Sequence, residues 1–220
     1  MAVDRRHMNR LLSVFAVLFM VLSVATGCST MRSVRGISVP ESKLKGRHPR
    51  VAIQVVVDSR VLTNINCGDT SKESDETNMQ RKIACKKTYN KGLPRGYVLL
   101  PKNQSVEGIV HQLLEKALTD SGFKVVDIES AGATTWVLDV IIDRFWTTYR
   151  PEDGRSLEAW LDVEVMANRG KRSQQFSIGG FGKVESSVIS ERHWQKVYAL
   201  TFETFLKQAQ SALQTNLSNK

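Results

Sequence analysis

Residues 157–165 read LEAWLDVEV, and this run decides the architecture expected for the whole chain. Successive side chains alternate in polarity along it, so one face points into a core and the other points toward solvent. The run therefore predicts a half-buried strand. Its inward set is Leu157, Ala159, Leu161, Val163 and Val165, and its outward set is Glu158, Trp160, Asp162 and Glu164.

Turns on both sides connect this strand to two others. The segment 151–154 (PEDG) precedes it and the segment 168–171 (NRGK) follows it, and both are rich in residue types that favour turns. The neighbouring strands are expected at residues 134–148 and 173–185. Three successive strands with short connections predict an antiparallel meander.

Two amphipathic helices lie on either side of the meander in sequence. The first begins after Ser105, which can cap it, and ends before Gly122, which can adopt a left-handed conformation. The second begins at Ser190. Both carry an apolar stripe at helical spacing: Val106, Ile109, Val110, Leu113, Leu114, Ala117 and Leu118 in the first, and Trp194, Val197, Tyr198, Thr201, Phe202, Phe205, Leu206, Ala209 and Leu213 in the second.

Further strands complete the expected fold. Residues 51–57 (VAIQVVV) form a β-branched run that fits a central strand, and residues 123–128 alternate in part. The resulting order is strand, insertion, helix, four strands, helix. It predicts an α+β fold, a largely antiparallel sheet with two long helices packed on one face, as a single domain over residues 51–217.

The insertion, at about residues 58–104, contains two cysteines. Cys67 and Cys85 enclose a polar, charged stretch, and residues 97–100 form a short strand candidate, so a β-hairpin is one possibility. An even pair of thiols in an exported domain predicts a disulfide, which stabilises a loop of this size by about 3 kcal/mol. A metal site would need neighbouring Cys or His ligands, and the sequence offers none. Long loops of this kind often carry binding functions.

The N-terminus has the layout of a secretory signal peptide. A basic head with Arg5, Arg6 and Arg10 precedes an apolar run from Leu11 and then small residues. The run is too short for a helix that spans about 30 Å of bilayer. Residues 25–28 (ATGC) resemble the lipobox of bacterial lipoproteins. The resemblance implies cleavage after residue 27, acylation of Cys28, including palmitate, and a membrane anchor through its acyl chains.

The residue after Cys28 is Ser29. In the lipoproteins that this motif resembles, an aspartate at that position retains the protein at the inner membrane. The resemblance therefore implies the outer membrane, with the domain in the periplasm. Residues 28–50 show no sustained periodicity and hold several cations, so we expect an acylated N-terminus followed by a flexible basic tether. Its cations could lie along anionic headgroups.

The net charge narrows the classes of partner. The formal charge is +9, and removal of residues 1–27, with three arginines and one aspartate, leaves +7. A positive charge would favour anionic partners such as lipid headgroups, lipopolysaccharide phosphates or peptidoglycan. Alternatively, the charge only keeps the domain soluble. Because export separates the protein from nucleic acid, no nucleic-acid partner is expected.

No motif predicts an enzyme, a cofactor or a metal site. Asp139, Asp143, Asp162 and Glu164 form a possible carboxylate cluster, but a solvated sheet face is the better interpretation. The glycines of residues 179–182 (GGFG) lack the context of a phosphate loop and favour a bulge or a close backbone approach. His111 with Glu115 fits a solvated helix face, and His193 a structural role.

The stretch 105–217 resembles the YajG-type family of uncharacterised bacterial lipoproteins. The similarity lies in the helix SVEGIVHQLLEKAL (105–118), the turn at 121–123, the meander and the last helix, whereas the cysteine-bounded insertion departs from the pattern. The family carries no settled activity. We expect a non-enzymatic outer-membrane lipoprotein that binds an envelope protein or stabilises an envelope assembly. The alternative is a binder or carrier of an anionic glycan or lipid that assists a transport system.

Overall fold

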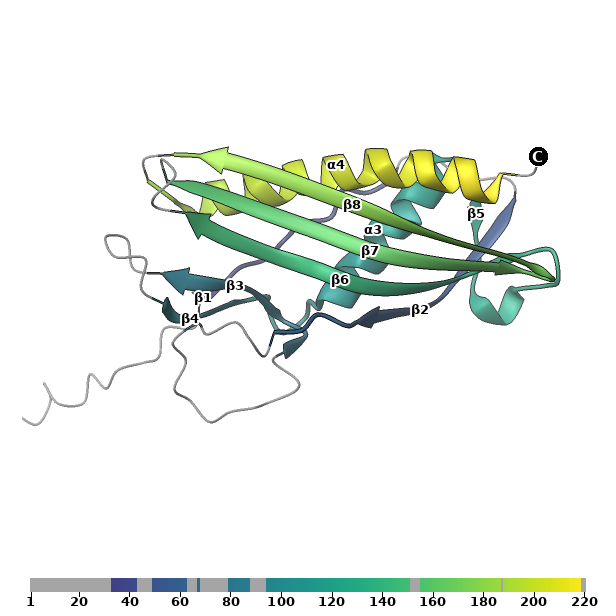
Figure 1. Ribbon diagram of the computed structural model, residues 1–220, viewed down its shortest axis with the longest axis horizontal. Coiled ribbons are helices and arrows are strands. Elements are labelled where there is room, and N and C mark those ends of the chain that lie inside the picture. Colours follow the sequence, from purple (N-terminus) through teal and green to yellow (C-terminus); the bar gives the residue numbers. More distant parts are fainter. Residues whose placement is uncertain are drawn as a thin grey trace, which may run out of the picture. The chain divides into compact units, whose positions relative to one another are not determined.

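The computed structural model of the protein describes residues 33–42, 49–62, 67, 79–87, 94–150, 155–186 and 188–218 (Figure 1). Its hydrophobic core is drawn entirely from residues between Ile37 and Leu217, so this part of the chain carries its own core. The predicted signal peptide (1–27) and Cys28 lie outside the described residues.

Strands and helices follow the predicted order, and the α+β class is confirmed. The elements are β1 (Ser33–Val34), β2 (Arg50–Asp58), β3 (Lys82–Lys87), β4 (Pro94–Leu99), α3 (Val106–Asp120), β5 (Lys124–Val125), a 3₁₀ turn (Ile128–Ser130), β6 (Trp136–Arg150), β7 (Ser156–Arg169), β8 (Arg172–Glu185) and α4 (Glu191–Leu217).

The long strand β6 organises the eight-stranded sheet. On one side it pairs antiparallel with β7, which pairs antiparallel with β8, and this is the predicted meander. On its other side β6 pairs in parallel first with β2 and then, at Thr147, with β3. β5 continues the sheet beyond β2, while β4 and then β1 continue it beyond β3. The sequence-based prediction of antiparallel neighbours is correct for β6, β7 and β8. It did not include the parallel pairings of β1, β2, β3 and β5.

Both helices cover the same face of the sheet (Figure 1). Ser105 caps α3 by accepting a hydrogen bond from the Gly108 N–H, and Gly122 takes a φ of 89° after the last turn, as predicted. α4 packs along β8 and contacts β7, and the Trp136 indole donates to the Leu217 carbonyl near its C-terminal end. The predicted apolar stripe of α3 is buried throughout.

The expected flexible tether over residues 28–50 is wrong for residues 33–42. β1 pairs with β4, the Arg35 N–H donates to the Leu99 carbonyl, and Ile37 is buried. The side-chain amide of Gln104 both donates to and accepts from the backbone of Ile37, as a neighbouring strand would. This segment has no periodicity because its contacts are made one residue at a time.

The strand predicted over residues 123–128 is also shorter in the structure. Only Lys124 and Val125 pair with β2, and Ile128 already lies in the 3₁₀ turn. Phe123 is buried because it packs into the core at the end of α3 rather than through strand alternation.

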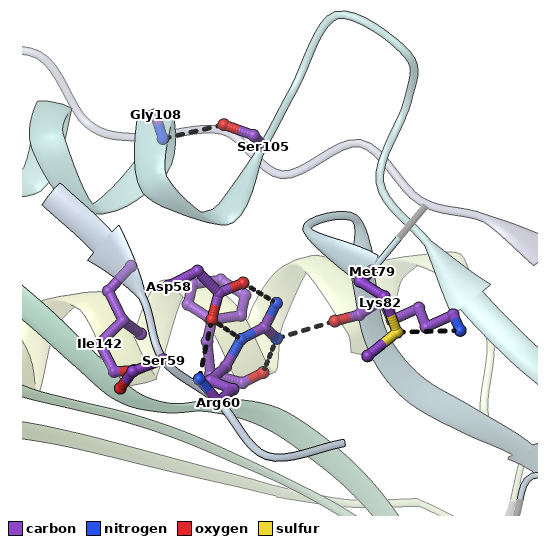
Figure 2. A network of polar contacts seen from close by, with 9 residues as sticks. Asp58, Ser59, Arg60, Met79, Lys82, Ser105, Gly108 and Ile142 are labelled. Atoms are coloured by element: carbon purple, nitrogen blue, oxygen red, sulfur yellow. Dashed lines mark hydrogen bonds and ion pairs between the residues drawn. The ribbon is translucent and has the colours of Figure 1, made fainter. Parts of the chain in front are cut away.

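A buried arginine occupies the junction between β2 and β3 on the edge of β6 (Figure 2). The Arg60 guanidinium donates from Nε and Nη2 to the two carboxylate oxygens of Asp58, at 2.7 and 2.6 Å. Its Nη1 donates to the carbonyls of Lys82 on β3 and Phe145 on β6, at 2.8 and 2.7 Å. The Arg60 side chain is 2% exposed. It therefore takes the place of the backbone donors that a continuous strand would offer to β6.

Aromatic side chains of α4 pack beside this junction. Tyr198 stacks on Phe145 with ring centroids 5.5 Å apart and accepts a hydrogen bond from the Thr147 hydroxyl. Burial raises the pKa of the Tyr198 phenol, although the Thr147 hydrogen bond and the Arg60 charge act in the opposite direction. The junction is thus tied to α4 as well as to three strands.

The glycines of β8 allow α4 to approach the sheet closely, which confirms one of the two sequence interpretations. A Cβ atom at Gly180 would lie 2.6 Å from the Thr201 carbonyl oxygen and 2.7 Å from the Phe205 Cβ. A Cβ atom at Gly182 would collide with the backbone of Val197 and Thr201. Any side chain at these positions would therefore push the helix away from the strand.

We predict that Arg60→Leu lowers the free energy of unfolding by about 3–5 kcal/mol, because Asp58 is left as an uncompensated buried charge. Denaturant unfolding measures this value. Arg144→Leu, which removes a half-exposed arginine, serves as the control and should cost no more than about 1 kcal/mol. Equal losses in both variants would contradict the role assigned to Arg60.

Gly180→Ala is expected to destabilise the domain by about 1–3 kcal/mol, because the added methyl group overpacks the contact with α4. Gly132→Ala is the matched control, since a Cβ atom there meets nothing within 4 Å. A comparison of thermal unfolding midpoints distinguishes the two. An unchanged midpoint for Gly180→Ala would show that α4 does not pack as described.

Candidate functional site

The face of the sheet opposite the helices is left uncovered by the described residues, and we call it the open face. Both helices lie on one side of the sheet (Figure 1), and the open face consists of the side chains of β2, β6, β7 and β8 that alternate with those buried against the helices. The predicted outward set of β7 lies here, half-buried, while its inward neighbours are fully buried. A solvated sheet face normally carries polar side chains. This one also carries the apolar Val55, Val57, Ile141, Trp146, Trp160, Met166 and Phe181.

Three aromatic residues form a row across this face, and we call it the aromatic row. Trp146 on β6 is in register with Trp160 on β7, which is in register with Phe181 on β8. The Trp160 and Phe181 rings lie 5.5 Å apart, and the Phe181 residue is 43% exposed. The Arg144 guanidinium lies 4.1 Å from the centroid of the Trp160 ring. Trp160 is therefore in contact with both a neighbouring ring and an arginine, and Trp146 lies beside it in the register of β6 and β7.

The charges beside the aromatic row are distributed unevenly. On one side, Glu158 is held by Arg150 at 2.8 Å and lies 3.9 Å from Lys183. On the other side are Asp139, Asp143, Asp162 and Glu164, which we call the acidic flank, with Arg144 the cation nearest the row. The Arg144–Asp162 pair is loose at 4.0 Å, and both side chains are nearly half exposed. The acidic flank therefore carries a net negative charge on a strongly basic protein.

Local electrostatics support this description of the acidic flank. Burial raises the pKa of the Asp162 carboxyl, Arg144 lowers it, and the nearby Asp143 raises it again. One carboxylate oxygen of Asp139, Oδ1, is buried without a hydrogen-bond partner among the described residues. The prediction that these acids share one face of the sheet is confirmed for Asp139, Asp162 and Glu164. A bulge between Ile142 and Arg144 displaces Asp143 from strict alternation.

The cysteine prediction is confirmed for the pair that the structure describes. Cys67 and Cys85 form a disulfide with their Cα atoms 5.2 Å apart, and Cys67 is buried. The Cys67 carbonyl accepts from the Gly96 N–H of β4, so the crosslink fastens the chain to the β3–β4 hairpin. Most of the loop between the cysteines lies outside the described residues.

The remaining residues singled out in the sequence have structural roles. His111 lies 3.7 Å from Glu115 on the exposed side of α3, as a solvated pair would. His193 accepts a hydrogen bond through Nδ1 from the Ser190 N–H and completes the N-terminal cap of α4. The glycines at 179, 180 and 182 belong to the β8 strand and hold no phosphate-loop geometry.

One pocket, of about 560 Å³, lies between α3 and the segment 39–42. Its cation, Lys116, is already engaged by Asp120 at 2.7 Å and by the Glu41 carbonyl at 3.1 Å. Within the described ranges, no group of three His, Cys, Asp or Glu side chains is placed to hold a metal ion. We therefore take the open face, with its aromatic row and acidic flank, as the candidate binding surface. None of the helices described is long and apolar enough to cross a membrane.

The aromatic row was not predicted from the sequence. Trp160 was recognised as an outward residue, but Trp146 and Phe181 were not connected with it because strand register is needed to align them. The buried pair of Asp58 and Arg60 was also missed, and its only sequence signal is the short spacing of two opposite charges at a strand end.

Comparisons with known proteins show similarity to solved structures only. No family model matches the chain, and no curated protein matches it. A Xanthomonas campestris protein of the DUF330 family is 10% identical, with 85% of this chain and 95% of that chain covered and a TM-score of 0.45. A hypothetical protein from Chlamydia trachomatis is 12% identical, with 79% and 98% covered and a TM-score of 0.43. A minor lipoprotein from Acinetobacter baumannii is 12% identical, with 49% and 80% covered and a TM-score of 0.33.

Replacement of both Cys67 and Cys85 by alanine is expected to lower the free energy of unfolding by about 3 kcal/mol, because the unfolded chain regains the freedom of a loop with a sequence separation of 18. Denaturant unfolding with and without a reductant measures the effect. The parent protein should lose stability on reduction and the double variant should not. Identical curves for all four samples would contradict a stabilising crosslink.

Proposed function

We propose that the protein is a non-enzymatic, lipid-anchored lipoprotein of the bacterial envelope whose domain binds a protein partner through the open face. The aromatic row is the observation that carries this proposal. Three rings in register, one of them stacked against an arginine, provide an ordered anchor on a face that the described chain does not cover. Apolar side chains that adjoin one another on an exposed face are typical of interaction sites.

The composition of the open face favours a protein as the partner. Tryptophan and arginine dominate the binding energy of protein interfaces, most often where few side chains must be ordered on binding. Trp160 is already held between Arg144 and Phe181, so little conformational freedom remains to be lost. We infer a partner that inserts apolar side chains at the row.

The acidic flank specifies the charge of that partner. Asp162 and Glu164 lie beside the aromatic row in the neighbouring register positions of β7, and the Asp162 side chain is nearly half exposed. A partner that presents lysine or arginine next to its apolar anchor would satisfy these groups. An anionic glycan or lipid would be repelled there, so the carrier alternative is less compatible with this face.

The anchor and location remain those that the sequence indicates. Acylation of Cys28 would hold the domain at a membrane, and more than one acyl chain is needed for stable anchoring. The serine after Cys28 favours the outer membrane, with the domain in the periplasm. Membership of the YajG-type family stays part of this proposal.

In-cell photo-crosslinking from position 181 tests the binding role. A photoreactive phenylalanine analogue at Phe181 is expected to capture one envelope protein, and Trp160→Ala should reduce that adduct at least tenfold through loss of the anchor. Asp162→Lys should also weaken it. The adduct is identified by mass spectrometry, and its surface should show lysine or arginine beside an apolar patch.

Two controls make the result specific. The analogue at Gln195, an exposed position on α4, should not yield the same adduct, and Lys207→Glu should leave capture from position 181 unchanged. An adduct that persists in Trp160→Ala would refute the open face as the docking surface. Capture of lipid or glycan alone would replace the proposal with the carrier alternative.

A further inference from the structure

One end of the sheet combines features that neither the open face nor the core explains. β3 pairs with the last part of β6 at Thr147, β4 pairs with β3, and β1 pairs with β4 (Figure 1). Val61 follows Arg60, which binds the Lys82 carbonyl, and Val188 precedes Glu191, which pairs with Arg35. We call β1, β3, β4 and these two valines the hairpin end.

The hairpin end is strongly basic. Between Met79 and Val106 the sequence has no aspartate or glutamate, whereas β3, β4 and the residues beside them hold Arg81, Lys82, Lys86, Lys87, Arg95 and Lys102. Among the described residues, Glu191 pairs with Arg35 and Glu185 with Lys183. The acids of the preceding loop, Asp69, Glu73, Asp75 and Glu76, lie outside the described residues. Much of the net positive charge of the mature chain is thus placed at this end.

The same end holds the large hydrophobic residues with the highest exposed fractions. Val61, Val188 and Val34 are 72%, 60% and 51% exposed, and these are the highest values among the large hydrophobic side chains of the described residues. Basic residues mixed with exposed apolar ones are typical of surfaces that lie in the headgroup region of a bilayer.

The chain length before β1 limits where this end can lie. Only residues 29–32 separate Cys28 from Ser33, so five Cα steps reach at most about 18 Å when fully extended. A lipid on Cys28 would keep β1 within two Debye lengths of the membrane surface, where a basic segment is attracted to anionic lipid. Tethering also raises the effective concentration, so weak attraction suffices.

We propose that the hairpin end seats the domain on the anionic phospholipid headgroups of the membrane. The argument from chain length rests on the proposed acylation of Cys28, whereas the attraction itself is a property of the described domain. Seated in this way, the sheet strands lead away from the bilayer, and the turn between β7 and β8 lies at the far end (Figure 1). The open face is then presented beside the membrane and remains available to a partner.

Vesicle sedimentation with the unacylated chain that begins at Ser29 tests the proposal, because residues 33–218 carry their own core. The protein should bind vesicles of phosphatidylcholine with phosphatidylglycerol and not vesicles of phosphatidylcholine alone, and added salt should weaken the binding. Lys86→Glu with Lys87→Glu should lower binding at least tenfold. The matched control, Lys171→Glu with Arg172→Glu at the far turn, changes the net charge equally and should bind like the parent.

Two other outcomes of the vesicle experiment would contradict the proposal. Equal loss in the two charge-reversal pairs, or no preference of the parent for phosphatidylglycerol, would overturn the proposal. If the first pair lowers the unfolding midpoint, Arg95→Glu with Lys102→Glu replaces it under the same criterion. Palmitate labelling of the full chain and of Cys28→Ser in cells tests the anchor separately, so a missing acyl chain would contradict the proposed anchoring without affecting the vesicle result.

Discussion

The buried guanidinium of Arg60 makes it possible for two separate strands to share one edge of β6. β2 ends at Asp58 and β3 joins at Thr147, so between these points no described strand pairs with this edge of β6, although β7 pairs with the other edge. Arg60 satisfies the Phe145 carbonyl there, binds β3 at Lys82, and is neutralised by Asp58 within the same turn. Because unsatisfied buried carbonyls and charges are costly, this one side chain determines how the β3–β4 insertion is attached to the domain.

The position of α4 depends on a different constraint, the absence of side chains on β8. Gly180 and Gly182 bring the helix backbone almost into contact with the strand, and Thr201 lies where a Cβ atom would otherwise be. This close approach uses the inward face of β8 entirely for the helix. The outward face of the same strand carries Phe181, which completes the aromatic row, and Lys183, which lies near Glu158 beside that row. Helix packing and the candidate docking surface are therefore two consequences of one strand.

Two surfaces of opposite charge follow from this architecture. The hairpin end gathers cations because residues 79–106 contain several lysines and arginines and no acid, and Arg60 fastens this segment to the end of β6. The acidic flank arises because β6 and β7 place their carboxylates on the face without helices. They lie in different parts of the sheet, so an anionic bilayer and a basic protein partner need not compete. The packed N-terminal segment, held by Gln104 and β4, connects the first surface to the site of the proposed lipid.

The sequence alone determined the order of the elements from α3 onward, both helices with their caps, the meander, the disulfide pair and the inward and outward faces of β7. These depend on local periodicity, on capping residues and on the number of available thiols. Only the tertiary structure decided the rest. Strand register aligned Trp146, Trp160 and Phe181; side-chain contacts ordered residues 33–42, which have no periodic pattern; and the shared edge of β6 created the need for Arg60. Each of these contacts joins residues of different strands or segments, and a local sequence pattern contains no information about which segments become neighbours in space.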